Sequence, residues 1–281
     1  MATTAPWICP TCKGSTSTAY CPDCGERRPS SRDLTLRGLL EQLLHAFSSI
    51  DSRLIRSLRL LLARPGELSL AYVGGQRLAY LLPLQIFLIA NVLFFATQSL
   101  THTNIVGALL DSHLHQQDWR ALAQSLVERR LEAEGTTLEA YAPVFDHSVV
   151  LNAKALIILI TVPFALVLPM MYYRSRQPFV AHFVFSLHFF AFVLLLFCVD
   201  LLVATANEHF GGGSLASPRV DLTLTVINMV VCGIYLYRAS GVFYGARGVT
   251  RVARTVILAL ALGALVVAYR FVIFLITLYA T

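Results

Sequence analysis

Residues 179–206 read FVAHFVFSLHFFAFVLLLFCVDLLVATA, a run that holds one charged side chain, Asp200. A membrane-spanning helix needs about 20 mainly apolar residues, because it must cross a hydrocarbon core about 30 Å thick. The run meets that requirement, and the whole chain of 281 residues is similarly poor in charge, with 14% charged residues and a net charge of +6. Soluble domains carry about 25% charged residues. We therefore predict that this chain has lipid as its solvent.

Four further apolar runs predict an all-α polytopic membrane protein with about five transmembrane helices. The expected spans are 78–100, 149–172, 179–206, 221–237 and 255–280. The fourth run is the shortest, so the sequence leaves open whether it crosses fully. The membrane domain is expected over residues 78–281, with a polar external loop at 101–148.

The basic residues lie mainly on one side of this arrangement. Sixteen Lys and Arg precede the first span or follow the second and fourth spans, against four on the other side. Because cytoplasmic loops carry an excess of Lys and Arg, we expect a cytosolic N-terminus and an external C-terminus. Residues 1–8 contain neither a basic start nor an apolar run, so no cleavable signal peptide is expected.

Two cysteine pairs, CPTC at 9–12 and CPDC at 21–24, precede the membrane domain. Two residues between paired thiolates let one turn present both sulfurs to one ion, and two such turns complete the tetrahedral shell of Zn²⁺. A complete shell is structural, and about thirty residues cannot build a core, so the metal would supply the folding energy. We predict a zinc knuckle or ribbon at 1–30 with one structural Zn²⁺. Its ligands would be Cys9, Cys12, Cys21 and Cys24; a redox dithiol pair and disulfides are the alternatives.

Residues 31–77 join the two parts. From Asp33, apolar residues recur at steps of three and four until Pro65-Gly66, which predicts an amphipathic helix. This helix either lies on the inner membrane face, with its arginines at anionic headgroups, or packs on the cytosolic ends of the spans. A nucleic-acid partner is not expected, because aromatic residues do not alternate with the basic ones. The arginines concerned are Arg53, Arg56 and Arg59.

Ionisable residues within the spans are candidates for function, because charge in hydrocarbon is costly. Lys154, Asp200 and Arg270 lie towards the outer side of their spans, and we expect Asp200 to pair with one of the two basic groups. Span three also holds His182 and His188, which are six residues apart and so about 120° off a shared face. Metal or haem ligation, proton transfer and hydrogen bonding between helices all stay open for these histidines.

The external loop contains Asp111-Ser-His113-Leu-His115. His113 and His115 could form a weak external metal site, and a solvated polar loop is the alternative. The loop lacks the His-Glu-x-x-His spacing of a zinc hydrolase. No catalytic residue is identified anywhere in the chain, so an enzyme acting on lipid-soluble substrates is the weakest interpretation.

A family resemblance is carried by four stretches spread over nearly the whole chain. They are Cys21-Pro-Asp-Cys-Gly; Arg64-Pro-Gly-Glu leading to Tyr72-Val-Gly-Gly-Gln-Arg77-Leu-Ala-Tyr80 and Pro83; His182-Phe-Val-Phe-Ser-Leu-His188 leading to Phe192; and Tyr244-Gly-Ala-Arg247 leading to Arg254. They resemble an uncharacterised bacterial domain-of-unknown-function family whose members pair an N-terminal zinc ribbon with several membrane helices. The resemblance implies a bacterial inner-membrane location. It also adds Arg77 and Tyr80 to His182 and His188 as recurrent positions, and it brings no known reaction.

The sequence thus favours a non-enzymatic membrane adaptor or sensor whose zinc module binds a cytosolic partner or the protein's own helices. The alternative is a transporter or channel for a small solute or ion. Such a transporter would use the residues Lys154, Asp200, Arg270, His182 and His188. Partner, substrate and oligomeric state are left open by the sequence.

Overall fold

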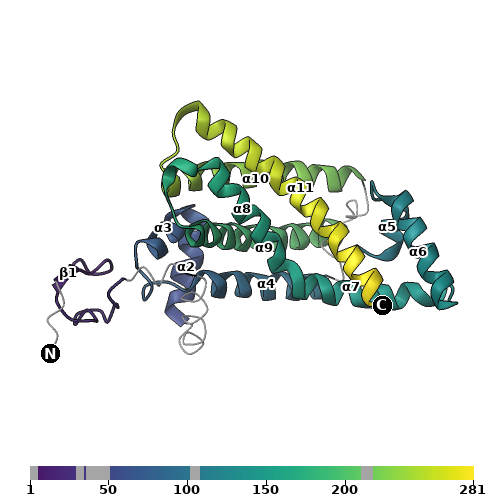
Figure 1. Cartoon of the computed structure of the whole chain (residues 1–281), viewed down its shortest axis with the longest axis horizontal. Helices are drawn as coiled ribbons and strands as arrows, with labels where there is room; N and C mark the ends of the chain where they lie inside the picture. Colours follow the sequence, from purple (N-terminus) through teal and green to yellow (C-terminus); the bar gives the residue numbers. More distant parts are fainter. Residues whose placement is uncertain (1–5, 30–34, 36–50, 102–107, 210–217) are drawn as a thin grey trace.

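Five helical segments in the described part of the chain are long and apolar enough to cross a membrane. They are Pro83–Leu100, Leu138–Met171, Phe179–Asn207, Thr223–Tyr244 and Gly248–Ala280. The computed structural model describes residues 6–29, 35, 51–101, 108–209 and 218–281. Figure 1 shows the long helices side by side, with the cysteine-containing segment beyond one end of the bundle and the C-terminus at the other. The expected fold class, about five membrane helices plus an N-terminal four-cysteine cluster, is confirmed.

The helices and strands follow one another in a simple order. They are β1 (Trp7–Ile8), β2 (Ser15–Thr16), α2 (Asp51–Ala63), α3 (Glu67–Val73), α4 (Pro83–Leu100), α5 (Leu110–His115), α6 (Arg120–Glu134), α7 (Leu138–Leu156), η2 (Ile157–Ile160), α8 (Thr161–Met171), η3 (Tyr173–Ser175), α9 (Phe179–His209), α10 (Pro218–Tyr244) and α11 (Gly248–Ala280). The two strands pair antiparallel, with Trp7 opposite Thr16. The fourth apolar run therefore lies in a helix of 27 residues, which is long enough to cross.

Helix α9 lies at the centre of the bundle, where it packs against α3, α4 and α8. Its sequence is apolar on every face, as expected of a helix surrounded by other helices or lipid. Phenylalanines from three helices fill the space around it, and Phe164 stacks on Phe189 with ring centroids 5.1 Å apart. The deepest of these rings, all of them less than 2% exposed, are Phe87, Phe94, Phe164 and Phe189.

The second membrane segment is not the single helix expected over 149–172. It begins eleven residues earlier, at Leu138, and consists of α7, the 3-10 turn η2 and α8. Pro163 has no N–H and would clash with the carbonyl four residues earlier, so a continuous α-helix is unfavourable there. The region 101–148 is likewise more helical than a loop. Its described part contains α5 and α6, and α7 begins within it at Leu138.

Side chains satisfy the backbone groups around this break. Thr161 Oγ1 donates to Ile158 O at 2.7 Å, and Ser186 Oγ of α9 donates to Thr161 O at 2.7 Å. Tyr269 Oη of α11 donates to Ala153 O at 2.9 Å. In a membrane such partners are required, because no water is present to replace a lost helical hydrogen bond. The break thereby joins α8 to α9, and α7 to α11.

Helix α2 packs against α3, α4 and α9. Ser57 and Leu61 are buried on its inner side, and Ser57 Oγ accepts a hydrogen bond from Leu81 N at 2.9 Å. The described part of the amphipathic helix therefore packs on the end of the bundle, the second of the two expected arrangements. Its earlier part, before residue 51, lies outside the described residues except for Thr35.

Gly66 sets the close approach between α3 and α10. Its φ of 89° lies in the left-handed region, which favours glycine. A Cβ atom built at Gly66 would lie 2.6 Å from the carbonyl oxygen of Ala239 and 2.9 Å from its Cα. Backbone atoms cannot rotate away as a flexible side chain can, so α3 reaches α10 only with glycine at this position.

We expect Gly66→Ala to lower the free energy of unfolding by about 2–4 kcal/mol, through left-handed strain and overpacking together. The matched control is Gly135→Ala, because Gly135 has φ 63° and a Cβ there meets nothing within 4 Å. That variant should cost only about 1 kcal/mol. Thermal unfolding in detergent compares the two, and equal melting temperatures would contradict the packing role of Gly66.

Candidate metal centre

Four cysteine thiols come together in the N-terminal segment. The Sγ atoms of Cys9, Cys12, Cys21 and Cys24 all lie within 4.8 Å of one another. Cys9 and Cys24 are 3.5 Å apart at sulfur, and Cys12 and Cys21 are 3.4 Å apart. In a tetrahedral shell with Zn–S bonds of 2.3 Å the sulfurs would be roughly 3.8 Å apart, whereas a disulfide requires about 2.05 Å. The cluster can therefore hold a metal ion such as zinc, and it does not have the geometry of a disulfide pair.

The two cysteine pairs adopt the same backbone turn. Four hydrogen bonds repeat with identical spacing: Cys9 N to Gly14 O at 2.8 Å, Lys13 N to Cys9 O at 2.9 Å, Cys21 N to Glu26 O at 2.7 Å, and Gly25 N to Cys21 O at 2.8 Å. The fourth residue after the first cysteine of each pair has positive φ, 64° at Lys13 and 75° at Gly25. This left-handed position reverses the chain and turns both thiols of a pair to the same side. The CPxC spacing thus produces two equivalent half-sites.

Backbone N–H groups favour the ionised form of the thiols, whereas the neighbouring thiols have mixed effects. Burial raises the pKa of the Cys9 thiol, but hydrogen bonds from the N–H groups of Cys12 and Thr11, together with the thiols of Cys24 and Cys12, outweigh it and lower the pKa to about 7. At Cys24 the N–H of Glu26 lowers the pKa, whereas burial and the other three thiols raise it, to about 12 overall. Four neighbouring thiolates repel one another, so full ionisation requires a cation at their centre. Metal binding would then release protons.

Glu26 joins this cluster to the membrane domain. Its side chain is 2% exposed, and its Oε2 accepts hydrogen bonds from Thr11 Oγ1 at 2.7 Å and from Leu78 N at 3.2 Å. Gln76 Nε2 donates to Pro10 O at 2.9 Å. Both half-sites therefore contact the segment that connects α3 to α4. We call these contacts of Glu26, Thr11, Leu78, Gln76 and Pro10 the joint.

The two histidines of α9 contact different helices. His188 is 2% exposed and its Nδ1 shares a hydrogen bond with Ser69 Oγ of α3 at 2.8 Å. His182 Nδ1 shares one with Tyr244 Oη of α10 at 2.8 Å. Tyr244 in turn stacks on Tyr172, with ring centroids 4.0 Å apart. Of the roles left open by the sequence, these contacts show hydrogen bonding between helices.

The expected pairing of Asp200 with Lys154 or Arg270 is not formed in the part of the chain that the structure describes, and this corrects the prediction. Asp200 Oδ2 instead accepts a hydrogen bond from Asn228 Nδ2 of α10 at 2.7 Å. Lys154 Nζ lies 5.8 Å from the ring centroid of Phe95. Arg270 lines a pocket between helices. An amide donor stabilises the Asp200 carboxylate without the desolvation of a second charge.

Three further candidates contact aromatic rings or the apolar core. The Arg77 guanidinium lies 5.4 Å from the ring centroid of Tyr72, and Tyr80 is half-buried against the main apolar core. His113 is 1% exposed and accepts a hydrogen bond from Trp119 Nε1 at 3.2 Å. Its ring lies tilted against that of Phe274, with centroids 4.7 Å apart.

The structure therefore places the two histidines of the external loop in different surroundings. His113 is enclosed by aromatic rings from three elements, whereas His115 lies at the surface with Nδ1 2.9 Å from Asp111 Oδ1. The ring of His113 points into the protein interior, and its contact with Phe274 holds α5 against α11.

Sequence reasoning missed the residues of the joint and Asn228. The only local signal for Glu26 is its place two residues after Cys24, at the position that donates its N–H to a thiol. From the sequence, a glutamate at this position would equally be predicted to be a solvated surface residue. Asn228 gave no signal, because an amide within an apolar run carries no charge to attract attention.

We expect Asn228→Leu to destabilise the protein by about 1–3 kcal/mol, because it leaves the Asp200 carboxylate without its donor. Adding Asp200→Leu to this variant should recover part of the loss. Adding Lys154→Met should change nothing further. Thermal unfolding in detergent measures all three. If Lys154→Met recovered the lost stability instead, the result would support the Asp200–Lys154 ion pair predicted from the sequence.

The pH dependence of stability should report on His113, which lies outside the five membrane segments. Burial lowers its pKa to about 4, a backbone hydrogen bond to Ala108 opposes this, and the charge of Arg270 lowers it further. The unfolded chain binds the proton near pH 6.5, so stability falls as the pH drops from 6.5 to 4, by about 1.4 kcal/mol per pH unit. His113→Phe should show a correspondingly flatter melting temperature across this range. Parallel curves for the two proteins would exclude a buried neutral His113.

Comparison with known proteins gives one match. Residues 51–95 match the model of a family described as "Protein of unknown function (DUF3667)". No curated protein and no solved structure matches the chain. The matched region runs from α2 into α4 and contains Gln76 and Leu78, the membrane-domain side of the joint. The resemblance expected from the sequence is confirmed, and the family that this chain resembles is DUF3667, whose function is unknown.

Proposed function

We propose that the protein is a non-enzymatic, multi-pass membrane adaptor or sensor whose N-terminal module is held together by one structural Zn²⁺. The observation that carries this proposal is the buried carboxylate of Glu26, which joins the first half-site through Thr11 to the membrane domain through Leu78. A module that served only to fold itself would not need this contact. The zinc module and the membrane helices act as one unit.

The coupling follows from the dependence of the module on metal. Strands of two residues and about thirty residues in all cannot form an independent core, so the zinc–thiolate bonds supply the folding energy. Loss of zinc would release the turn around Cys21 and Glu26. The Leu78 N–H and the Gln76 side chain would then lose their acceptors, and the segment between α3 and α4 would change its structure.

The location proposed is the bacterial inner membrane, with the zinc module in the cytosol. The arginine-rich ends of the spans lie at the same end of the bundle as the module, which supports this orientation. A reducing cytosol also keeps thiols available for metal. Arg53, Arg56 and Arg59 of α2 would face anionic headgroups there, with Arg56 and Arg59 on the exposed side of the helix.

A cytosolic protein is the proposed partner of the module. Two large apolar side chains remain on its surface, Ile8 at 70% and Tyr20 at 60% exposure. Exposed aromatic and aliphatic groups on a small rigid module are suitable anchors for another protein. The transporter alternative is less supported, because the ionisable side chains do not converge on one site. Each has its own partner on a helix other than its own; the residues are Lys154, Asp200, His182 and His188.

Metal content tests the first half of the proposal. Purified protein should contain one zinc per chain, and Cys12→Ser should lose it, since three thiolates leave the shell open. Cys198→Ser is the matched control, because Cys198 lies in α9 away from the cluster, and it should keep its zinc. Elemental analysis gives the ratio. A zinc content below half an equivalent per chain, with disulfides between the four cysteines, would contradict the zinc assignment.

Coupling and partner binding are tested together. Glu26→Ala should keep the zinc yet increase amide hydrogen exchange in residues 75–82. The control is Ser125→Ala in α6, whose hydroxyl donates to Leu122 O at an exposed position, and it should leave exchange in residues 75–82 unchanged. A photo-crosslinking residue at Tyr20 should capture a cytosolic protein in cells, and Cys12→Ser should abolish the product. The adaptor proposal fails if Glu26→Ala leaves exchange unchanged and no zinc-dependent product forms. Substrate-dependent flux in liposomes would instead favour a transporter.

A further inference from the structure

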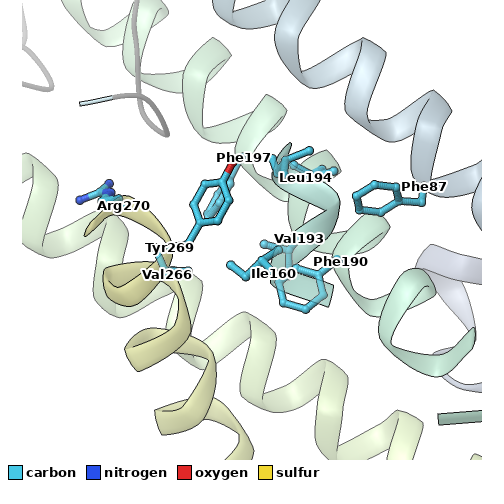
Figure 2. A pocket seen from close by; sticks show the side chains of 10 residues that line it. Phe87, Ile160, Phe190, Val193, Leu194, Phe197, Val266, Tyr269 and Arg270 are labelled. Carbon is cyan, nitrogen blue, oxygen red and sulfur yellow. The ribbon is translucent and has the colours of Figure 1, made fainter. Parts of the chain in front are cut away.

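A pocket of about 60 Å³ lies between α9 and α11 within the membrane-spanning part of the bundle. Figure 2 shows its lining side chains, with the rings of Phe87 and Phe190 on one side and Arg270 at the opposite edge. Eight of the ten lining residues are apolar, and the other two are Tyr269 and Arg270. At roughly 10–15 Å³ for each water-sized group, the space holds about four to six such groups.

Burial distinguishes the floor of this pocket from its mouth. Phe87 is fully buried and Phe190 is 3% exposed, so these rings form the floor. Phe197, Val266 and Arg270 are partly exposed and form the mouth, which lies between α9 and α11. Both helices are candidate membrane spans, so a mouth between them faces lipid and not water.

The break in the second membrane segment maintains the space. Ile157 and Ile160 of η2 line the pocket, where the chain changes from α7 to α8. Tyr269 cannot rotate into the space freely, because its hydroxyl is held by Ala153 O at 2.9 Å. Helix α11 packs chiefly on α7, α8 and α10, which leaves its Val266–Arg270 side turned towards α9 across the pocket.

Arg270 lies near one boundary of the hydrocarbon core. It follows Arg254 by sixteen residues, or about 24 Å along a helix. If Arg254 marks the boundary at the zinc-module end, Arg270 is roughly 6 Å short of the opposite boundary of a core about 30 Å thick. An arginine side chain spans that distance by extending its head to the interface. The pocket therefore combines an apolar chamber with a cation that reaches the headgroup region.

We propose that this pocket binds the end of one acyl chain of an anionic phospholipid from the leaflet opposite the zinc module, with the lipid phosphate at Arg270. The last few carbons of the chain, about four to six, would enter between Phe197 and Val266 and end against Phe190 and Phe87. Guanidinium groups bind phosphate with paired hydrogen bonds. Phosphatidylcholine carries the same phosphate, but its choline cation neutralises that charge, so the charge of Arg270 favours a lipid with a net negative headgroup. This site is separate from the metal centre, and its occupation does not depend on zinc.

The test uses the full-length protein in a neutral detergent, with phosphatidylglycerol or phosphatidylcholine added, and counts retained lipids by native mass spectrometry. The wild type should retain one phosphatidylglycerol about tenfold more tightly than phosphatidylcholine. Val266→Phe, which fills the mouth, should reduce phosphatidylglycerol retention at least about fivefold. The matched control is Val272→Phe on the same helix, since Val272 is 43% exposed and does not line the pocket; it should retain lipid as the wild type does.

A second pair of variants tests the headgroup contact. Arg270→Gln should reduce the preference for phosphatidylglycerol to the level of phosphatidylcholine, and Arg270→Lys should keep most of it. If Val266→Phe does not fold, Ile160→Phe replaces it. Ile160 lies at the end of η2, next to α8, and its substitution fills the same pocket. Equal retention of the two lipids by the wild type overturns the proposal. So does a loss of retention in Val272→Phe as large as that in Val266→Phe.

Discussion

The structure depends on one constraint. Inside a hydrocarbon core no water is available, so backbone and side-chain polar groups need hydrogen-bond partners within the protein. The break at η2 is possible because Thr161, Ser186 and Tyr269 hydrogen-bond the carbonyls around it. The same requirement accounts for the contacts of the buried ionisable groups, in which Asp200 finds Asn228 and His188 finds Ser69. Apart from the local Thr161–Ile158 bond, each of these bonds crosses from one helix to another. Polar residues in the spans thereby determine which helices are neighbours.

Local patterns were predictable from the sequence, and contacts between distant segments were not. Apolar length predicted the five spans, and the CPxC spacing predicted the thiol cluster, because both depend on a few consecutive residues. The partner of Asp200 was predicted wrongly. Charge alone favoured Lys154 or Arg270, whereas the packing of α9 on α10 brings a neutral amide closer. The break near Pro163 was also missed, because membrane helices often tolerate proline without losing continuity.

The joint unites two parts that the sequence shows as separate. The four cysteines lie outside the region that matches DUF3667, whereas Gln76 and Leu78 lie inside it. Gly75 has φ 90°, and a Cβ there would lie 2.8 Å from Cγ of Pro29, so the connecting segment is shaped for close approach of the module. Glycine at this position serves two purposes. It allows the left-handed turn, and it leaves room for Pro29 of the module.

Because the module and its docking segment belong to the same chain, their contact is intramolecular. The effective concentration of one part around the other is set by the chain that connects them and reaches millimolar values for short flexible connections. A soluble protein that used the same docking surface would have to overcome this local excess, so only a tight or abundant competitor would succeed. A ligand that bound the exposed side chains of Ile8 and Tyr20 would meet no such competition. Under the proposed adaptor function, tethering would thus direct a partner to those exposed side chains and keep the segment between α3 and α4 for the module.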